Sequence, residues 1–295
     1  MKPAPFKYYD PETTAEVVAL LDQYGDEAKL LAGGQSLGPV LNMRLSSPEV
    51  IIDLNRVDTL RYIEPSNGAL RLGAMTLEST LEDDAAFSQR QPLIAAAIPY
   101  IGHRAIRNRG TVGGSLVHAD PAAEWPMLAV MLEAEIELKS KSSGKRSLKA
   151  EDFYVDFLTT AVKDDELLTR VQIPEWPSDA SWSFIEFSRR HGDFAIAGIG
   201  VQLQVDTNNR CQDVKIGLLG VHPLPCRAKM SEAMLRGQLL SDELVIAAAQ
   251  QATAGTEPGN DIHASATYRR HLTITLAERA LQQAYRDSIG KHIHV

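Results

Sequence analysis

The spacing of apolar residues predicts alternating helices and strands at the start of the chain. From Val17 to Tyr24 the apolar positions recur at i, i+3, i+4 and i+7, which is one face of a helix over residues 14–24. A capping-box pattern begins at Thr13 and Gly25 follows the last apolar position, so both helix ends are marked. Short apolar runs predict strands at 29–32 and 50–54, with a helix at 37–45 between them. This alternation is typical of an α/β unit that is too small to be a complete domain.

The pattern changes near Pro174 and Pro177, where two prolines indicate a linker. We therefore expect domains at 1–175 and 178–295, the first made of subdomains at about 1–58 and 59–175. The remaining elements expected in the first domain are a hairpin of 61–64 and 69–73, helices at 76–83, 92–98 and 124–132, a strand at 135–139 and an exposed hairpin tip at 139–149. Strands at 182–188, 196–205 and 214–219, followed by helices at 227–236, 242–253 and 268–285, predict an α+β domain with a three-stranded sheet.

Two glycine pairs, each beside hydroxyl residues, are the strongest candidates for a binding site. The first lies in Ala32-Gly33-Gly34-Gln35-Ser36 and the second in Thr111-Val112-Gly113-Gly114-Ser115. Glycine tolerates positive φ and has no Cβ, so the N–H groups of such a turn can face an anion. Taken alone, the first pair is equally well a plain turn between strand and helix. Two pairs together favour a pyrophosphate held from two sides by neutral backbone donors.

Other nucleotide and catalytic motifs are missing from the sequence. Neither glycine pair is followed by the Gly-Lys-Ser/Thr of a Walker loop, and Gly198-Ile199-Gly200 lacks the third glycine of a dinucleotide fingerprint. Nothing indicates a Ser-His-Asp or Cys-His nucleophile or a His-Glu-x-x-His metal motif. His103, His118 and His191 are more simply surface or hydrogen-bonded residues than ligands. The chemistry would therefore belong to a bound cofactor.

Composition narrows the class of protein. The net charge of −8 argues against a nucleic-acid or anionic-membrane surface. The two cysteines, Cys211 and Cys226, form no Cys-x-x-Cys pair, which excludes a self-contained iron–sulfur cluster and suits a reducing compartment. No signal-peptide core and no run of membrane-spanning length is evident, so we expect a cytoplasmic protein without membrane insertion or nucleic-acid binding.

Several stretches together resemble the FAD-binding medium subunits of the molybdenum hydroxylases, the family of carbon monoxide dehydrogenase medium subunits and of the xanthine dehydrogenase flavin domain. The matching stretches run in order from residue 32 to about 281, and therefore cover nearly the whole chain. They are Ala32-Gly33-Gly34-Gln35-Ser36, Arg109-Gly110-Thr111-Val112-Gly113-Gly114-Ser115 with Asp120-Pro121-Ala122-Ala123-Glu124, Ser188-Arg189-Arg190-His191-Gly192-Asp193-Phe194-Ala195, and His263-Ala264-Ser265-Ala266-Thr267-Tyr268-Arg269-Arg270-His271-Leu272.

The resemblance implies a fold and a set of cofactor-binding residues. Residues 1–175 would form an FAD-binding domain of the vanillyl-alcohol-oxidase type (PCMH type), followed by the C-terminal domain of the same family. Ala32, Gly33, Gly34, Gln35, Ser36, Thr111, Gly113, Gly114 and Ser115 would hold the pyrophosphate and adjoining parts of noncovalent FAD. Glu124, Ile101 and Leu168 would lie at the flavin end, and Asp193, near Arg189 and Arg190, is a further candidate. No catalytic residue and no metal ligand is expected in this chain.

The sequence departs from the family pattern at three places. Ser115 replaces a frequent asparagine, and Glu124 is one methylene longer than the usual aspartate. A lysine that several members carry just before the Arg-Arg pair is absent, the local residues being Ile185 and Glu186. Because that lysine lies near the flavin in NAD-reducing relatives, its absence weakens the expectation that NAD⁺ is the acceptor.

The function implied by the resemblance is electron transfer. FAD on this chain would receive electrons from two-iron clusters of a small subunit, while a large subunit would oxidise the substrate on a molybdenum cofactor. The expected assembly is a dimer of heterotrimers. The alternatives are a self-sufficient flavin oxidase and a non-catalytic nucleotide-binding or assembly module.

Overall fold

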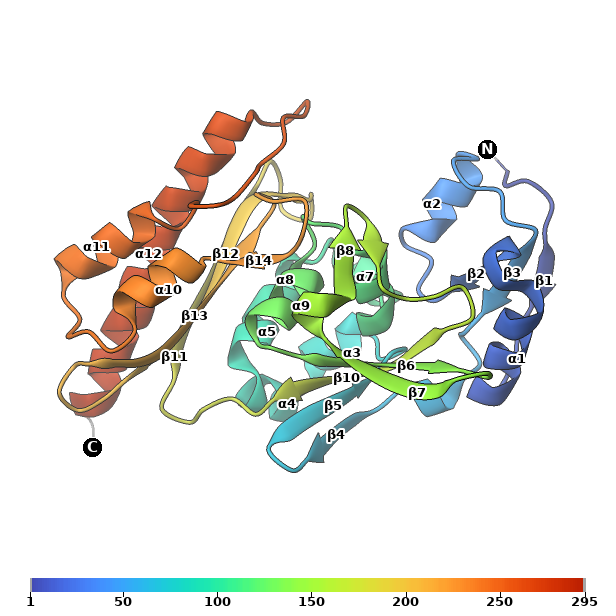
Figure 1. The fold of residues 1–295 in the computed structure, drawn as a ribbon, viewed down its shortest axis with the longest axis horizontal. Helices are drawn as coiled ribbons and strands as arrows, with labels where there is room; N and C mark the ends of the chain where they lie inside the picture. The colour runs from blue at the N-terminus through green and yellow to red at the C-terminus, as the bar shows by residue number, and fades with distance from the viewer. Residues whose placement is uncertain (1, 294–295) are drawn as a thin grey trace. The chain divides into compact units, whose positions relative to one another are not determined.

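The computed structural model describes residues 2–293, which form two compact units interleaved along the chain (Figure 1). The first unit contains the chain up to Asp83 together with residues 104–119 and 134–174. The second contains residues 84–103 and 120–133 and the chain from Glu175 onward. The two-domain boundary at 175–178 remains a prediction.

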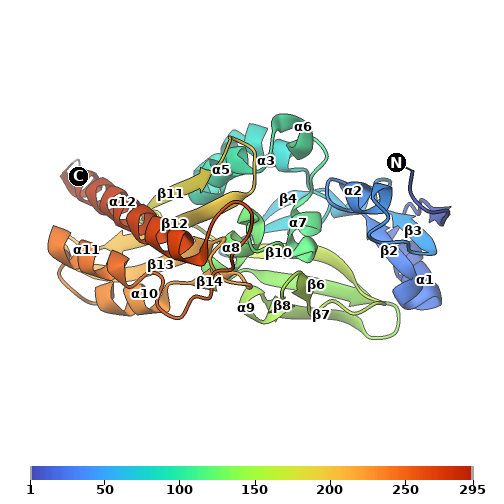
Figure 2. The same cartoon turned by 90° about the horizontal axis from the view of Figure 1, so that it is seen from above.

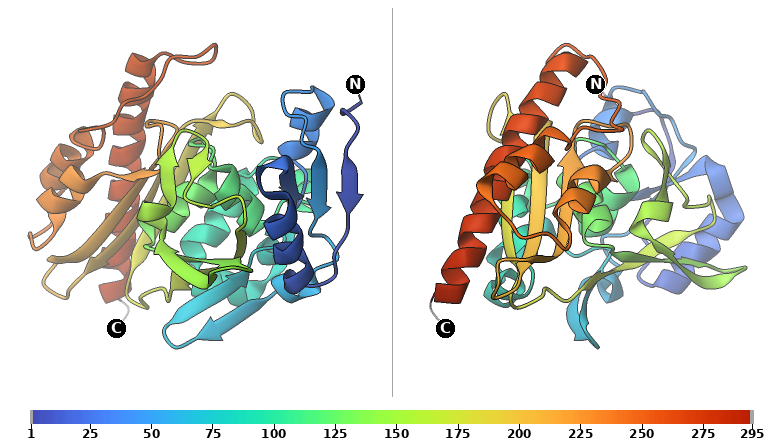
Figure 3. Two further views of the ribbon diagram at one scale, coloured as in Figure 1. Left: turned by 45° about the vertical axis from the view of Figure 1, so that its right-hand side comes forward. Right: turned by 60° about the vertical axis from the view of Figure 1, so that its left-hand side comes forward.

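A small parallel sheet begins the first unit. Its order is β1 (Lys7–Tyr9), β3 (Val50–Asp53), β2 (Ala28–Leu31). Helix α1 (Thr14–Tyr24) has the predicted bounds and the predicted capping box at Thr13. Its apolar stripe, including Val17, is buried with Val50 and Ile52 in one core, and the helix lies beside these strands in Figure 3. Strand β1 was not predicted, because a strand of three residues is too short to show a periodic pattern of apolar positions.

The second sheet of this unit is antiparallel. Its order is β4 (Ile63–Ser66), β5 (Ala69–Gly73), β10 (Leu167–Pro174), β6 (Glu135–Ser140), β7 (Gly144–Lys149), and Figure 2 labels β4, β10, β6 and β7 in this order. The predicted hairpins at 61–73 and 139–149 are both present, while β10 was missed. The shorter elements are η1 (Gly25–Glu27), α2 (Leu37–Asn42), η2 (Asp58–Leu60), α3 (Glu78–Asp83), α6 (Arg104–Arg107), α7 (Val112–His118), α9 (Ala150–Phe153), β8 (Tyr154–Asp156) and β9 (Thr159–Thr160).

The second unit is built on an antiparallel sheet of four strands. They are β11 (Ser181–Ser188), β12 (Ala195–Val205), β13 (Cys211–Leu219) and the two-residue β14 (Cys226–Arg227), which adds a strand to the three that were predicted. Helices α10 (Lys229–Leu235), α11 (Asp242–Gln250) and α12 (Ala266–Ile293) share one core with this sheet. In the right panel of Figure 3, α12 lies in front of the strands. The other helices are α4 (Ala85–Arg90), α5 (Pro92–Ala97), η3 (Ile98–Tyr100) and α8 (Glu124–Met131).

The two faces of this sheet differ in side-chain size. Ile199 and Val201 of β12 lie in the core with α12. The alternate residue Gly200 faces α8, and so does Gly217 of β13, because a Cβ at either position would contact Met127 of that helix. All eight residues of α8 are buried. Glycine thus allows a fully buried helix to lie close against the sheet.

Gly217→Ala is expected to lower the free energy of unfolding by about 1–3 kcal/mol, because overpacking has that cost. The new Cβ would lie 2.3 Å from Met127 Sδ and 3.0 Å from Met131 Cβ. Urea unfolding measures the change, with Gly259→Ala as control, since no atom lies within 4 Å of a Cβ there. In a Met127→Ala background the same substitution should cost less, and an undiminished cost would contradict the proposed steric cause.

Candidate functional site

The first glycine pair forms the turn between β2 and α2 in the first unit. Gly34 has φ +72°, the left-handed conformation that favours glycine. The side-chain amide of Gln35 donates to the Gly33 carbonyl at 2.9 Å. Asn55 donates to the Ala32 carbonyl at 3.0 Å. The carbonyl groups of the turn are therefore held by neighbouring amides, and its shape is fixed.

The backbone N–H groups of this turn have no hydrogen-bond partner in the part of the chain that the structure describes. Among the described residues 2–293, no hydrogen bond is donated by the N–H groups of residues 33–37. Ser36 occupies the N-cap position of α2, yet its side chain makes no capping bond. Buried and half-buried N–H groups are nearly always paired in folded proteins. This row of donors therefore fits an acceptor supplied by a ligand.

The second glycine pair uses its N–H groups differently. Gly113 donates to the Ala74 carbonyl at 2.8 Å, and Gly114 donates to the Thr111 hydroxyl at 3.1 Å, which caps α7. Val112 and Ser115 donate to backbone carbonyl groups as well. The backbone donors of this stretch therefore hold the framework. Its contribution to a ligand would come from the Ser115 hydroxyl and from the space that glycine leaves.

The structure brings the two glycine stretches together in the first unit. A Cβ on Gly33 would lie 2.1 Å from the Arg109 carbonyl oxygen and 3.0 Å from Gly110 Cα. A Cβ on Gly114 would lie 3.5 Å from Ala32 Cβ. The contact between Gly33 and the Arg109 backbone is possible only because Gly33 lacks a side chain.

Leu168 is the remaining predicted residue in the first unit. It lies on β10, is 4% exposed, and pairs with Leu138 immediately before a β-bulge. A bulge disrupts the ladder locally and turns backbone groups out of register. Its predicted role in FAD binding stays a prediction.

Three predicted residues lie in the second unit. Ile101 follows η3 and donates its N–H to the Ile98 carbonyl at 3.0 Å. Glu124 is the first residue of α8 and is 7% exposed. Asp193 is exposed in the loop between β11 and β12. Their roles in FAD binding also stay predictions.

A cluster of aromatic rings lies in the second unit. The Tyr100 ring lies 5.2 Å from Phe184 and 6.4 Å from His191, in edge-to-face arrangements. Gly192 has φ +87°, and a Cβ there would lie 2.5 Å from the His103 ring. His103 and His191 are thus packing neighbours of a tight loop, whereas His118, the third histidine weighed, ends α7 in the first unit.

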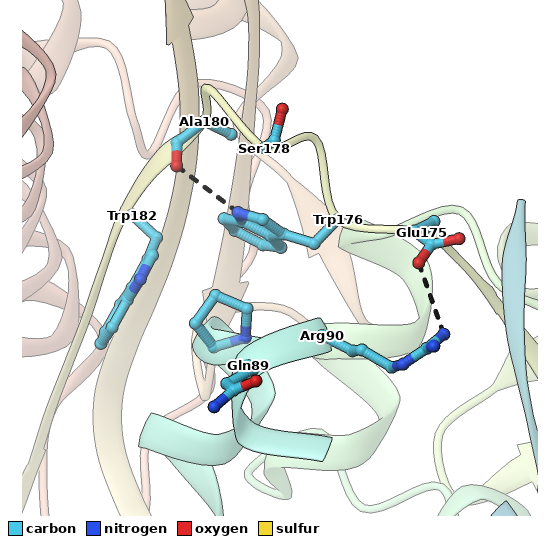
Figure 4. Close-up of a pocket in the computed structure, with 8 residues that line it drawn as sticks. Gln89, Arg90, Glu175, Trp176, Ser178, Ala180 and Trp182 are labelled. Atoms are coloured by element: carbon cyan, nitrogen blue, oxygen red, sulfur yellow. Dashed lines mark hydrogen bonds and ion pairs between the residues drawn. The ribbon is translucent and has the colours of Figure 1, made fainter. Parts of the chain in front are cut away.

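A pocket of the second unit lies away from every predicted site residue. In Figure 4 the Trp176 ring lies between Trp182 and Arg90, Arg90 pairs with Glu175 at 3.4 Å, and the indole of Trp176 donates to the Ala180 carbonyl at 3.4 Å. Its lining comes from α4, α5 and residues 175–182. None of the residues assigned to FAD is among them.

Neither cysteine is placed to hold a metal. Cys211 is buried and Cys226 is half-buried, and burial raises the pKa of the two thiols to about 11 and about 12. No group of three or more metal-ligating side chains is found in residues 2–293. In the same part of the chain, no helix has both the length and the apolar character needed to cross a bilayer.

Two residues escaped the sequence-based prediction. Asn55 holds the first glycine turn, and its position after β3, which is parallel to β2, is a usable signal, because the carboxyl ends of parallel strands meet at one sheet edge. Glu186 hydrogen-bonds Glu124, although the two are far apart in sequence. No pattern of neighbouring residues in the sequence predicts such a pair.

Two family models together match most of the chain. One is described as the FAD binding domain in molybdopterin dehydrogenase and matches residues 4–176. The other is the CO dehydrogenase flavoprotein C-terminal domain and matches residues 182–284.

Named relatives match over nearly their full lengths. The chain is 37% identical to the 6-hydroxypseudooxynicotine dehydrogenase complex subunit alpha of Paenarthrobacter nicotinovorans, covering 96% of each protein. Its fold matches a chain of carbon monoxide dehydrogenase from Hydrogenophaga pseudoflava with a TM-score of 0.93 at 35% identity, covering 97% of this chain and 99% of that one. A chain of quinoline 2-oxidoreductase from Pseudomonas putida 86 matches with a TM-score of 0.92 at 35% identity, covering 98% and 99%. The chain therefore belongs to the FAD-binding medium subunits of the molybdenum hydroxylase family.

Proposed function

We propose that this chain binds noncovalent FAD and transfers electrons from iron–sulfur clusters of a partner subunit to an external acceptor. It is an oxidoreductase subunit, the flavoprotein component of a molybdenum hydroxylase. The observation that carries the FAD assignment is the row of unpartnered N–H groups at residues 33–37, held beside the second glycine stretch. Diphosphate oxygens are acceptors of the kind that such a turn favours.

The proposed site combines backbone donors with hydroxyl groups. Residues 33–37 would donate N–H groups to the diphosphate, and the Ser36 and Ser115 hydroxyls would complete the hydrogen bonding. Thr111, Gly113 and Gly114 would hold the second wall in place rather than donate to the ligand. Ala32 and Gln35 would shape the turn, while Ile101, Leu168, Glu124 and Asp193 are proposed at the flavin end.

FAD, when bound, supplies the redox chemistry by accepting and passing on electrons. The residues of this chain would bind FAD, orient it and provide the polar and apolar groups that surround it. As in the family to which the chain belongs, the molybdenum cofactor and the two-iron clusters are assigned to partner subunits. Relatives are named as medium chains, and we propose a large and a small partner, a dimer of heterotrimers, and a cytoplasmic location.

Purification of the native protein tests this function. We expect FAD to co-purify at one per chain with a larger, molybdenum-containing subunit and a smaller, iron-containing one. Flavin absorbance measures the FAD content, metal analysis measures molybdenum and iron, and native mass spectrometry identifies the subunits of the complex. A lone chain whose flavin is reduced directly by a substrate would favour a self-sufficient oxidase. A flavin-free chain that binds only plain nucleotides would favour a nucleotide-binding module.

A further inference from the structure

Glu186 and Glu124 meet on the glycine-lined face of the second unit's sheet. Glu186 on β11 pairs in register with Gly198 on β12, so both face the same side of the sheet. Gly200, two residues on, lies against Met127 and Met131 of α8. Glu124 shares a helix stripe with these methionines, at i, i+3 and i+7. This arrangement directs Glu124 toward Glu186, and the two carboxyl groups are hydrogen-bonded.

The helices and the central strand beside this carboxyl pair are largely apolar. On this face α5, η3 and β12 carry no charged residue, and Glu124 is the only one in α8. Strands β13 and β14, which also pack against α8, carry Asp213, Lys215 and Arg227. Lys215 and Arg227 pair with Glu133, Arg227 pairs with Glu232 as well, and Asp213 pairs with Arg236. Tyr100 packs against Phe184, which lies on the same face of β11 as Glu186, and His191 and His103 follow in the same cluster. Helix α12, with its charged residues Arg279, Arg286 and Asp287, packs on the opposite face of β11, on the side of Ile185.

One oxygen of Glu186 is also buried without a hydrogen-bond partner among the described residues. That oxygen costs much less to bury in a neutral carboxylic acid than in a carboxylate. Burial, followed by the negative charge of Glu124 and the hydrogen bond between the two groups, raises the pKa of Glu186 to about 9. A hydrogen bond between two carboxyl groups itself requires a proton on one of them.

We propose that Glu186 and Glu124 share one proton in the folded protein, and that Glu186 is a positioning residue that holds the Glu124 carboxylate for FAD. The pair then carries a single negative charge. Its one O–H group donates the hydrogen bond between the two carboxyl groups. The positioning role rests on the proposed function, which places Glu124 at the flavin end of the cofactor. The shared proton does not, because it belongs to the protein without FAD.

The shared proton is tested on the full-length chain without FAD. At pH 7 we expect an infrared band of a protonated carboxyl group, which Glu186→Gln should remove and Glu135→Gln, an exposed control on β6, should leave. Between the ordinary pKa of 4.5 and about 9, the folded protein keeps a proton that the unfolded chain releases. Stability should therefore fall as pH rises from 6 to 9, with a smaller fall of Tm in Glu186→Gln. Absence of the band together with equal pH profiles would overturn the shared proton.

The positioning role is tested by FAD titration of the same proteins. Glu186→Gln keeps a donor to Glu124 and should bind FAD with a Kd close to that of the wild type. Glu186→Ala removes the donor and should weaken binding about tenfold or more. Raising the pH toward 10 should weaken FAD binding by the wild type but not by Glu186→Gln. If wild type binds FAD and Glu186→Ala binds equally well, the positioning role is wrong. If wild type binds no FAD, the proposed function fails instead, while the infrared result still decides the shared proton.

Discussion

Gly33→Ala should abolish FAD retention and lower the free energy of unfolding by about 3 kcal/mol. The added Cβ would lie 2.1 Å from the Arg109 carbonyl oxygen and 2.7 Å from its carbon. Both are backbone atoms, so relief requires the loop at 109–110 to move away from the turn at 33–34. That movement separates the two glycine stretches that form the proposed diphosphate site. Flavin content of the purified protein and urea unfolding measure the two effects.

Helix α2, which follows the first glycine turn, offers a matched control for stability. Gly38 lies in α2, and no atom is found within 4 Å of a Cβ built there. Alanine is a better helix former than glycine, so Gly38→Ala should be neutral or stabilise the protein by up to about 1 kcal/mol. Gly114→Ala should be intermediate, because the one close contact of its Cβ is with the Thr111 side-chain hydroxyl at 2.7 Å, and Ala32 Cβ lies at 3.5 Å. Full flavin content and unchanged unfolding of Gly33→Ala would refute the close contact.

Glu232→Ala should lower the free energy of unfolding by about 3–5 kcal/mol, because it removes the buried carboxylate that pairs with a largely buried arginine. Glu232 is 3% exposed and accepts two hydrogen bonds from Arg227, each at 2.8 Å. The same carboxylate accepts the N–H of Ile216 on β13 at 2.8 Å. Its removal therefore also leaves a backbone donor of the sheet unpaired.

Arg227 provides the control, because it pairs with a second carboxylate. Glu133 accepts from Arg227 and from Lys215, each at 2.7 Å, but its side chain is 56% exposed. Glu133→Ala should cost no more than about 1 kcal/mol, as is usual for exposed pairs. Equal losses in the two variants, measured by urea unfolding, would show that burial does not set the strength of this network.

Local signals were sufficient for part of the fold and of the site. The capping box and the apolar stripe specify α1 because both lie within one short segment. The first glycine turn was recognised for a similar reason, since strand, glycines and helix are contiguous. The family resemblance then supplied the fold class and the cofactor, which the residues alone left open between a plain turn and a phosphate site.

The rest depends on residues that are distant in sequence. Strand β10 pairs with β5 and β6, and its buried run resembles a helix segment equally well until those partners are known. At the second glycine stretch, the N–H group of Gly113 donates to the carbonyl group of Ala74, which directly follows β5 and is distant in sequence. The bond between Glu124 and Glu186 joins α8 to β11. Such pairings are created by tertiary folding, so no local pattern records them.

The burial of every residue of α8 has a consequence during protein synthesis. The helix ends at Met131, whereas β13, the strand of the sheet that packs against it, ends only at Leu219. At about 5–20 residues per second, the ribosome needs roughly 4–18 s to make the intervening chain. For that time α8 is an apolar segment without its cover, which is the kind of sequence that chaperones bind. The interleaving of the two units therefore delays completion of the second unit until the C-terminal strands have left the ribosome.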